Sequence, residues 1–260
     1  MDGPGPGRRV VMVNGWRCPP GCWGGLDDAL RAAGFRVETA DAPEGVLRGG
    51  PRDIAAWLAP RVTASGPVHG LVGYSLGAQV VPLLARAMHP APARVVMLAP
   101  PVAPLAPRTW LPRSGRELAG VPVLGGALFL AVVAALARRP RRLEAAYRRA
   151  AGRPGHVDHE PLAGFVAATT RTITSSSLRV AAASLAATMG IDLRPCAPSV
   201  PGSVLVCCGE HDPLAPPEPG GDFAAAAPDG RYAEIPGAGH FPHLEYPAEA
   251  AELVLGHLRG

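Results

Sequence analysis

The sequence contains no lysine, because all 25 of its basic residues are arginine. Without lysine the chain cannot form the glycine-rich phosphate loop that ends in a conserved lysine, so this class of nucleotide site is excluded. The turn after the first apolar run, Asn14–Gly25, also lacks the G-x-G-x-x-G pattern of dinucleotide-binding folds. We therefore expect a protein that works without an organic cofactor.

Aromatic residues are scarce at 5% of the chain, and the net charge is only +4. The positive charge is local, since residues 101–195 hold 13 arginines against five acidic residues while the remainder is net negative. Proteins that bind nucleic acid usually carry a broad basic face with aromatic side chains interleaved. We do not expect nucleic acid as a partner.

A long uninterrupted apolar segment is also missing. Leu118–Ala137 has no charge over a length that could cross a membrane, but one proline and three glycines interrupt its first half. We expect a buried or pocket-lining helix from Gly126 on. Met1–Arg9 is rich in glycine and proline, and Val10–Val13 is too short for the apolar core of a secretory signal. The expectation is a cytoplasmic protein that does not bind a membrane surface.

The five cysteines show no paired C-x-x-C spacing, which excludes the common zinc-binding patterns. Cys18 and Cys22 are four residues apart, and we expect reduced thiols there, a local disulfide being the alternative. Cys207 and Cys208 lie in a strand-like run and are interpreted as small core residues. The segment HVDHE at 156–160 is not the H-E-x-x-H motif, so we expect no metal site.

Short β-branched runs alternate with helical stretches, the pattern of βα units around a mostly parallel sheet. The expected strands are Arg9–Val13, Arg36–Thr39, Val68–Gly73, Arg94–Leu98, Ser203–Cys208 and Tyr232–Ile235. The expected helices are Gly24–Ala33, Asp53–Ala64, Leu76–Met88 and Pro247–Leu258, with a weaker one in Glu218–Ala226.

Between Pro100 and Pro198 this alternation stops, and nothing in the segment resembles a strand. An apolar stretch at 121–137 is followed by an arginine-rich one at 138–153 and by a helical one near Phe165–Met189. We expect an α/β core formed by residues 1–100 and 196–260, interrupted by a helical cap at 101–195.

The segment Gly73-Tyr74-Ser75-Leu76-Gly77 matches G-x-S-x-G between an apolar strand and a helix. A sharp strand-to-helix turn brings the residues two positions either side of the serine close together, and glycine removes the clash. The Ser75 hydroxyl would then be exposed at the carboxyl edge of the sheet, above a helix N-terminus. An ordinary helix N-cap serine is the alternative.

A serine hydroxyl is a weak nucleophile unless a histidine, oriented by a carboxylate, removes its proton. Asp212 follows the strand Ser203–Cys208, and His240 follows the last strand. Both positions are loops at the carboxyl ends of neighbouring strands, so the two side chains can meet above Ser75. Glu210 is the rival acid, and His243 is interpreted as a packing residue.

These segments together resemble the α/β-hydrolase superfamily, and specifically its capped serine hydrolases, with a helical lid inserted between two strands. The resemblance rests on VNGW at 13–16, GYSLGA at 73–78, GIDLRP at 190–195, GEHDPLAP at 209–216 and GAGHFPHLEYP at 237–247. It implies that Ser75 is the nucleophile, His240 the general base and Asp212 the acid. It also implies an oxyanion hole formed by the backbone N–H groups of Leu76 and Trp16.

Three positions depart from the pattern of that superfamily. Asn14 stands where a histidine is usual, so the hydrogen bonds of this loop must differ. Met1–Arg8 leaves almost no room for the usual first antiparallel strands, which predicts a shortened sheet of about six strands. Tyr74 stands where many carrier-protein thioesterases have histidine.

The function expected from these residues is hydrolysis of an ester, thioester or lactone of an apolar or polyketide-like acyl group through an acyl-serine. The expected substrate walls are Trp16, Tyr74, Pro101, Phe129 and Phe241. The alternatives are acyl transfer, ring closure or carbon–carbon bond hydrolysis with the same residues, and a ligand-binding module without catalysis. The arginine cluster Arg138–Arg153 could be a solvated helix face or a docking surface for an acyl-carrier protein or coenzyme A.

Overall fold

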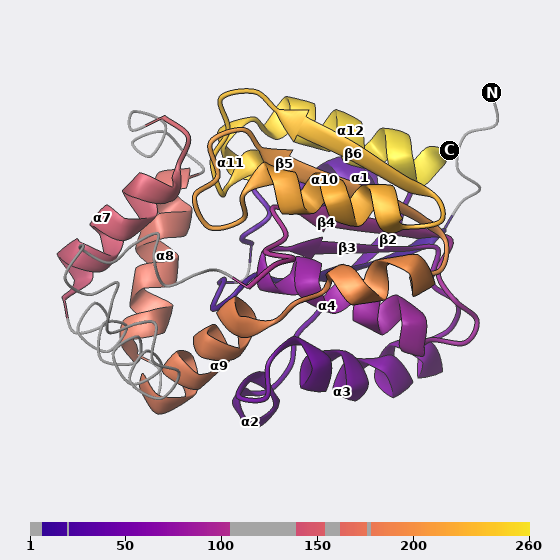
Figure 1. The fold of residues 1–260 in the computed structure, drawn as a ribbon, viewed down its shortest axis with the longest axis horizontal. Coiled ribbons are helices and arrows are strands. Elements are labelled where there is room, and N and C mark those ends of the chain that lie inside the picture. The colour runs from indigo at the N-terminus through magenta and orange to yellow at the C-terminus, as the bar shows by residue number, and fades with distance from the viewer. Residues whose placement is uncertain (1–6, 20, 105–138, 154–161, 176–177) are drawn as a thin grey trace.

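The computed structural model describes residues 7–19, 21–104, 139–153, 162–175 and 178–260. Six strands form one parallel sheet in the order β2-β1-β3-β4-β5-β6 (Figure 1). Their bounds are Arg9–Val13, Arg36–Ala40, Gly70–Tyr74, Arg94–Leu98, Ser203–Gly209 and Gly230–Ile235 for β1 to β6. The prediction of a six-stranded parallel sheet flanked by helices is confirmed, with strand ends shifted by two residues at most.

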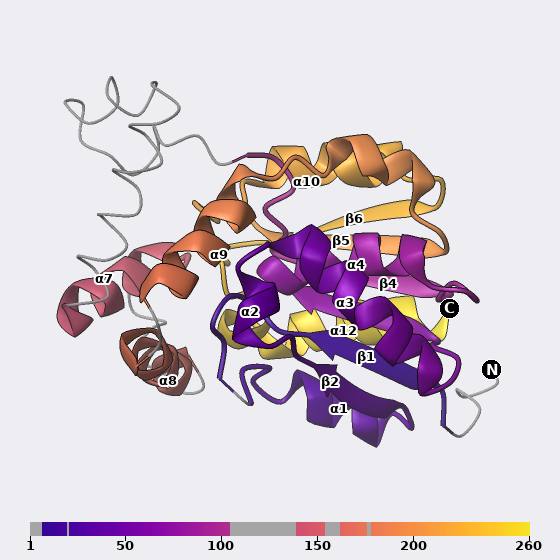
Figure 2. The same ribbon diagram turned by 90° about the horizontal axis from the view of Figure 1, so that it is seen from below.

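The central strands are buried on both faces, and their side chains alternate between two hydrophobic cores. In β1, Val11 and Val13 belong to one core, whereas Val10 and Met12 belong to the other. The first core is covered by α3 (Pro51–Ala64), α4 (Leu76–Ala87) and α10 (Pro217–Ala226). The second is covered by α1 (Leu26–Ala32) and α12 (Pro247–Arg259) (Figure 2).

Three short elements were not predicted from the sequence. They are α2 (Glu44–Leu47), α11 (Pro242–Glu245) and a 3₁₀ segment η3 (Arg194–Ser199). Each has a proline just before it or among its first residues, and each is too short to show helical periodicity. Helix α11 matters for function because it follows directly on the loop that carries His240.

The insertion between β4 and β5 contains three described helices, α7 (Pro140–Ala150), α8 (Leu162–Ser175) and α9 (Leu178–Gly190). The helical stretch expected near Phe165–Met189 is confirmed, and α8 and α9 occupy its described residues. All three helices lie beyond the end of the sheet where α11 lies (Figures 1 and 2). The apolar stretch at 121–137, with Phe129, and the HVDHE segment lie outside the described residues. The domain bounds therefore stay a prediction.

The insertion shares the second hydrophobic core with the sheet. Ala150 and Ala151 at the end of α7, and Leu162 and Phe165 in α8, are buried in the same cluster as Tyr74. The arginines of α7 include exposed side chains at 139, 141, 142 and 149, so their docking role stays a prediction. None of the helices in the described ranges is long and apolar enough to span a bilayer.

All five cysteines are free thiols. Cys207 and Cys208 are fully buried in β5, as expected for core residues, and burial raises the pKa of the Cys207 thiol to about 12. These two thiols are therefore uncharged near neutral pH. Cys18 and Cys22 are also free thiols in the structure, and their pairing in a local disulfide stays an untested alternative.

Candidate active site

Ser75 occupies the sharp turn between β3 and α4. Its backbone has φ 51° and ψ −111°, a left-handed conformation that costs a non-glycine residue free energy and is held here by the surrounding structure. The Ser75 N–H donates to the carbonyl of Leu98 at 2.9 Å, which fixes the turn to the next strand. The two flanking glycines are required, since a Cβ at Gly73 would overlap the Gly77 backbone and one at Gly77 would overlap the Val13 carbonyl.

Replacing Gly77 with alanine should lower the free energy of unfolding by about 3 kcal/mol or more, because the added methyl group meets only backbone. Urea denaturation of the variant measures this. Gly221 in α10 is the matched control, since its added Cβ would meet nothing within 4 Å. That second alanine should raise stability by about 0.5–1 kcal/mol. Equal changes in unfolding free energy for the two alanine variants would show that the backbone around Gly77 has room for a Cβ atom.

Three side chains that are distant in the sequence meet in one hydrogen-bonded line. The Nε2 atom of His240 lies 2.9 Å from the Oγ of Ser75, and its Nδ1 lies 2.8 Å from Oδ2 and 3.0 Å from Oδ1 of Asp212. All three residues are at most 9% exposed, so bulk water competes little for these bonds. The structure thus places Ser75, His240 and Asp212 in the geometry that proton transfer from the serine requires.

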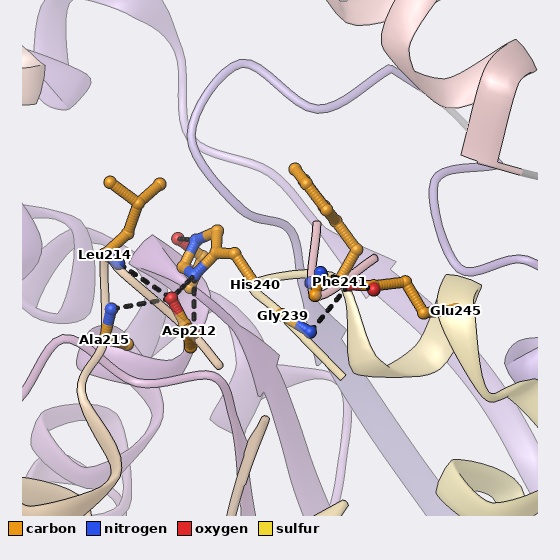
Figure 3. Close-up of polar contacts among 9 residues, drawn as sticks. Asp212, Leu214, Ala215, Gly239, His240, Phe241 and Glu245 are labelled. Atoms are coloured by element: carbon orange, nitrogen blue, oxygen red, sulfur yellow. Dashed lines mark hydrogen bonds and ion pairs between the residues drawn. The ribbon is translucent and has the colours of Figure 1, made fainter. Parts of the chain in front are cut away.

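The carboxylate of Asp212 is itself held by backbone donors. Its Oδ1 accepts the N–H groups of Leu214 and Ala215, each at 2.8 Å (Figure 3). These bonds fix the orientation of the carboxylate toward the imidazole. The rival acid, Glu210, has other partners. Its carboxylate accepts the Gly237 N–H at 2.8 Å and is about half exposed. Of the two acids, only Asp212 is hydrogen-bonded to His240.

The backbone of the loop after β1 lies against the first turn of α4, next to Gly77, and the oxyanion donors expected at Leu76 and Trp16 stay a prediction. The Leu76 N–H is at the first position of α4, where a helix offers no acceptor, and among the described residues the Trp16 N–H has no backbone acceptor. Asn14 organises the loop in place of the usual histidine, since its Nδ2 donates to Asp41 and its Oδ1 accepts the Trp23 indole N–H, both at 2.9 Å.

A cavity of about 330 Å³ lies beside this loop. Its walls are largely apolar and include Trp16, Leu47, Ile54, Leu76 and Val80. Leu76, which directly follows Ser75, and Trp16 both border the cavity. The Trp16 indole N–H donates to the Ser184 hydroxyl at 2.8 Å, which connects the loop to α9 of the insertion.

Two of the expected substrate walls lie in the core instead of on an open surface. Tyr74 is 2% exposed and packs against the rings of His243 and His240, with centroids 4.4 and 5.6 Å away. Phe241 is 1% exposed and is covered by Tyr147 and Phe165 of the insertion. Neither residue borders the cavity. Both pack beside the His240 loop, and their role as substrate walls stays a prediction.

Pro101 is also buried, and its carbonyl accepts a hydrogen bond from Gln79 at 2.6 Å. Gln79 lies one turn of α4 after Ser75, and its amide also donates to the Thr188 carbonyl at 2.8 Å. This side chain is fully buried and joins the nucleophile helix to the strand β4 loop and to α9. Gln79 could not be predicted from the sequence, because no periodic or motif signal marks a buried amide in an apolar helix.

His243 is a packing residue, as interpreted from the sequence. It is 1% exposed, and its Nε2 lies 3.1 Å from the Cys22 carbonyl, so the neutral ring donates there. Burial lowers the pKa of the His243 imidazole to about 4. The group is therefore uncharged in the folded protein, and its ring fills the space between Trp23 and Tyr74.

This lowered pKa predicts a loss of stability in acid. The unfolded chain takes up a proton at His243 below about pH 6.5, whereas the folded chain does so only near pH 4, so this contribution is intact above about pH 6.5. It should disappear by about pH 4 and amount to about 3 kcal/mol. Urea titrations across this window should show a shallower decline in unfolding free energy for His243→Gln than for wild type.

The exposed His211 is the matched control, and His211→Gln should keep the wild-type dependence of unfolding free energy on pH. An identical decline in wild type and His243→Gln would show that His243 is not the group that takes up the proton.

The comparisons with known proteins agree with this architecture. Residues 10–253 match the model of a family described as the alpha/beta hydrolase family. The enol-lactonase from Burkholderia xenovorans LB400 is 23% identical, with a TM-score of 0.74 over 98% of this chain and 92% of that one. An esterase from Thermogutta terrifontis (20%, 0.70) and a bromoperoxidase from Bacillus anthracis (20%, 0.77) are similar over the same shares.

At these identities the structural neighbours establish the fold and leave the substrate open. The activities that give these proteins their names also differ, which is expected where one scaffold carries many reactions. The family model spans nearly the whole chain, from β1 into α12. The chain belongs to the alpha/beta hydrolase family.

Proposed function

We propose that this protein is a serine hydrolase that cleaves an ester, thioester or lactone through an acyl-Ser75 intermediate. The observation that carries the proposal is the buried hydrogen-bonded line from Ser75 through His240 to Asp212. A structural serine needs only a hydrogen-bond acceptor. Here the serine also has a strained backbone and a histidine whose other nitrogen is held by a carboxylate.

In the first half of the reaction, the Oγ of Ser75 attacks the carbonyl carbon while the Nε2 of His240 takes the hydroxyl proton. The carbonyl oxygen becomes an oxyanion, which the N–H groups of Leu76 and Trp16 stabilise by donation. His240 then gives its proton to the departing alkoxide or thiolate, the bond to the leaving group breaks, and the acyl group remains on Ser75.

In the second half, His240 takes a proton from a water molecule, whose oxygen attacks the acyl carbon. The ester bond to Ser75 breaks, the Oγ regains a proton from His240, and a carboxylic acid is released. Asp212 keeps its two backbone donors, which hold its carboxylate against the imidazolium that forms in each half. In this scheme Asp212 orients the imidazole ring and takes up no proton itself.

The cavity beside the β1 loop supports an apolar acyl group as the substrate part held by the enzyme. It is lined by Leu76 and Trp16, which carry the proposed oxyanion donors, and by the aliphatic side chains of Leu47, Ile54 and Val80, while Arg17, Asp41 and Glu44 form a charged part of its wall. An acyl chain entering it would lose contact with water at a free-energy gain of about 0.8 kcal/mol for each buried methylene group. We therefore propose ester or thioester substrates with an uncharged acyl chain.

The test combines a covalent probe with a substrate panel. A fluorophosphonate probe should label Ser75 in the wild-type protein and leave the Ser75→Ala variant unlabelled. A panel of p-nitrophenyl esters and acyl thioesters of graded chain length should then show a length optimum set by the cavity. Labelling without turnover of the panel, but with product from an added alcohol or amine, would favour acyl transfer. No labelling of well-folded protein would favour a ligand-binding module.

A further inference from the structure

The carboxylate of Glu245, at the end of α11, connects two parts of the chain that are far apart in sequence. Its Oε1 accepts the N–H groups of Gly239 at 3.0 Å and Phe241 at 3.2 Å, the two residues that flank His240 (Figure 3). Its Oε2 accepts the N–H of Gly152, just past the end of α7, at 2.8 Å. One half-buried carboxylate thus holds three backbone donors from the histidine loop and from the insertion.

The remaining donor of the loop is fixed by the same part of the insertion. The backbone N–H of His240 donates to the carbonyl of Ala150, the last residue of α7, at 2.7 Å. The N–H groups of three consecutive residues, 239 to 241, are therefore all bound by α7 or by Glu245. A chain segment so restrained has little freedom to rotate the imidazole away from Ser75.

The backbones of the two segments also touch directly. A Cβ at Gly239 would overlap the Ala150 carbonyl, and a Cβ at Gly152 would overlap the Gly237 carbonyl. Because a glycine lies on each side of this contact, the backbone at the end of α7 packs directly against the backbone of the histidine loop. The ring of Tyr147 in α7, 6.0 Å from that of Phe241, extends the contact.

We propose that Glu245 is a positioning residue for His240, and that the end of α7 belongs to the same rigid unit. The insertion then acts as part of the catalytic framework at this point, so that displacement of the α7 end would misplace the general base. This inference rests on the proposed function, since it assigns Glu245 a role through His240. It concerns a residue that touches neither the Ser75 hydroxyl nor the cavity.

The decisive variant is Glu245→Gln, which keeps the shape of the side chain. A glutamine has one carbonyl oxygen, so its NH₂ group must face an N–H donor of Gly152 or of the histidine loop, and at least one bond is lost. We expect kcat to fall about 10- to 100-fold, because small misplacements of a catalytic group cost about that much. KM should change by at most about twofold, since the substrate cavity is untouched.

Glu252→Gln is the matched control, because this glutamate is exposed on α12 and the substitution removes the same charge. The control should keep wild-type kcat and KM within about twofold. The rate of fluorophosphonate labelling of Ser75 should slow in Glu245→Gln in proportion to kcat, at a temperature where thermal unfolding shows both variants folded. Labelling and kcat equal to wild type would overturn the proposal.

Failure of the proposed function can be told apart from failure of the Glu245 proposal, because the fluorophosphonate probe would then not label even the wild-type protein. If Glu245→Gln does not fold, amide hydrogen exchange of the wild-type protein tests the proposed rigid unit instead. The N–H groups of Gly152, Gly239, His240 and Phe241 should exchange at one common slow rate, since one opening event releases all four. Exchange of Gly152 at the rate of an unstructured peptide, with the other three protected, would overturn the proposed unit.

Discussion

Replacing Ser75 with alanine should lower kcat/KM toward the best ester or thioester by roughly 10⁵- to 10⁶-fold. The reason is that the variant keeps the cavity and the oxyanion donors but has no oxygen to attack the carbonyl carbon. His240 loses only its 2.9 Å contact, and its bonds to Asp212 remain. Stability should be unchanged or slightly higher, because the substitution removes one buried hydroxyl. Steady-state kinetics with a burst assay measures the loss.

Ser65 provides the matched control, since it is exposed at the end of α3 and its hydroxyl contacts only the Arg61 carbonyl. Ser65→Ala should keep full activity and, like Ser75→Ala, should keep the wild-type circular dichroism. Retention of more than about one per cent of wild-type kcat/KM by Ser75→Ala would remove Ser75 as the nucleophile, because an alanine cannot form the acyl-enzyme.

Replacing Asp212 with asparagine should lower kcat by about 10⁴-fold. The Leu214 and Ala215 N–H groups bind Oδ1, so the asparagine carbonyl must stay there and its NH₂ group takes the place of Oδ2, which is the nearer of the two to Nδ1 of His240, at 2.8 Å against 3.0 Å. That NH₂ group donates to Nδ1, and the imidazole then carries its proton on Nε2. A protonated Nε2 in a neutral ring cannot accept the proton of the serine hydroxyl.

The neighbouring acid gives the control for Asp212. Glu210 accepts the Gly237 N–H and is not hydrogen-bonded to the imidazole of His240. Glu210→Gln should therefore cost less than about tenfold in kcat, mostly through a looser β6 loop. A loss confined to Glu210→Gln, with Asp212→Asn near wild type, would reverse the assignment of the acid.

The strands and the three central site residues could be predicted from local patterns. Ser75 is marked by its glycines, which are needed because backbone atoms of 73, 77 and Val13 approach within contact distance. Asp212 and His240 are marked by the strands that precede them, because parallel strands end at one edge of the sheet. Each of these signals is carried by residues close together in the chain.

The roles of Tyr74, Phe241, Gln79 and Glu245 could not be predicted in this way. Tyr74 and Phe241 were expected to contact substrate, yet their rings pack under and beside the imidazole. Glu245 lies in the segment GAGHFPHLEYP at 237–247, but its partner Gly152 is 93 residues away. Nothing in the pattern of the chain connects the arginine-rich end of α7 with the histidine loop.

The sequence by itself determined which segments become strands, that they form a parallel sheet, and that a serine, an acid and a histidine end at one edge. These follow from steric and hydrophobic preferences that act over a few residues. Only the tertiary structure decided which acid orients the histidine, which aromatic rings are buried, and which carboxylate holds the loop. Those outcomes depend on packing and hydrogen bonds between segments distant in the chain, whose directions are fixed only when the whole core has formed.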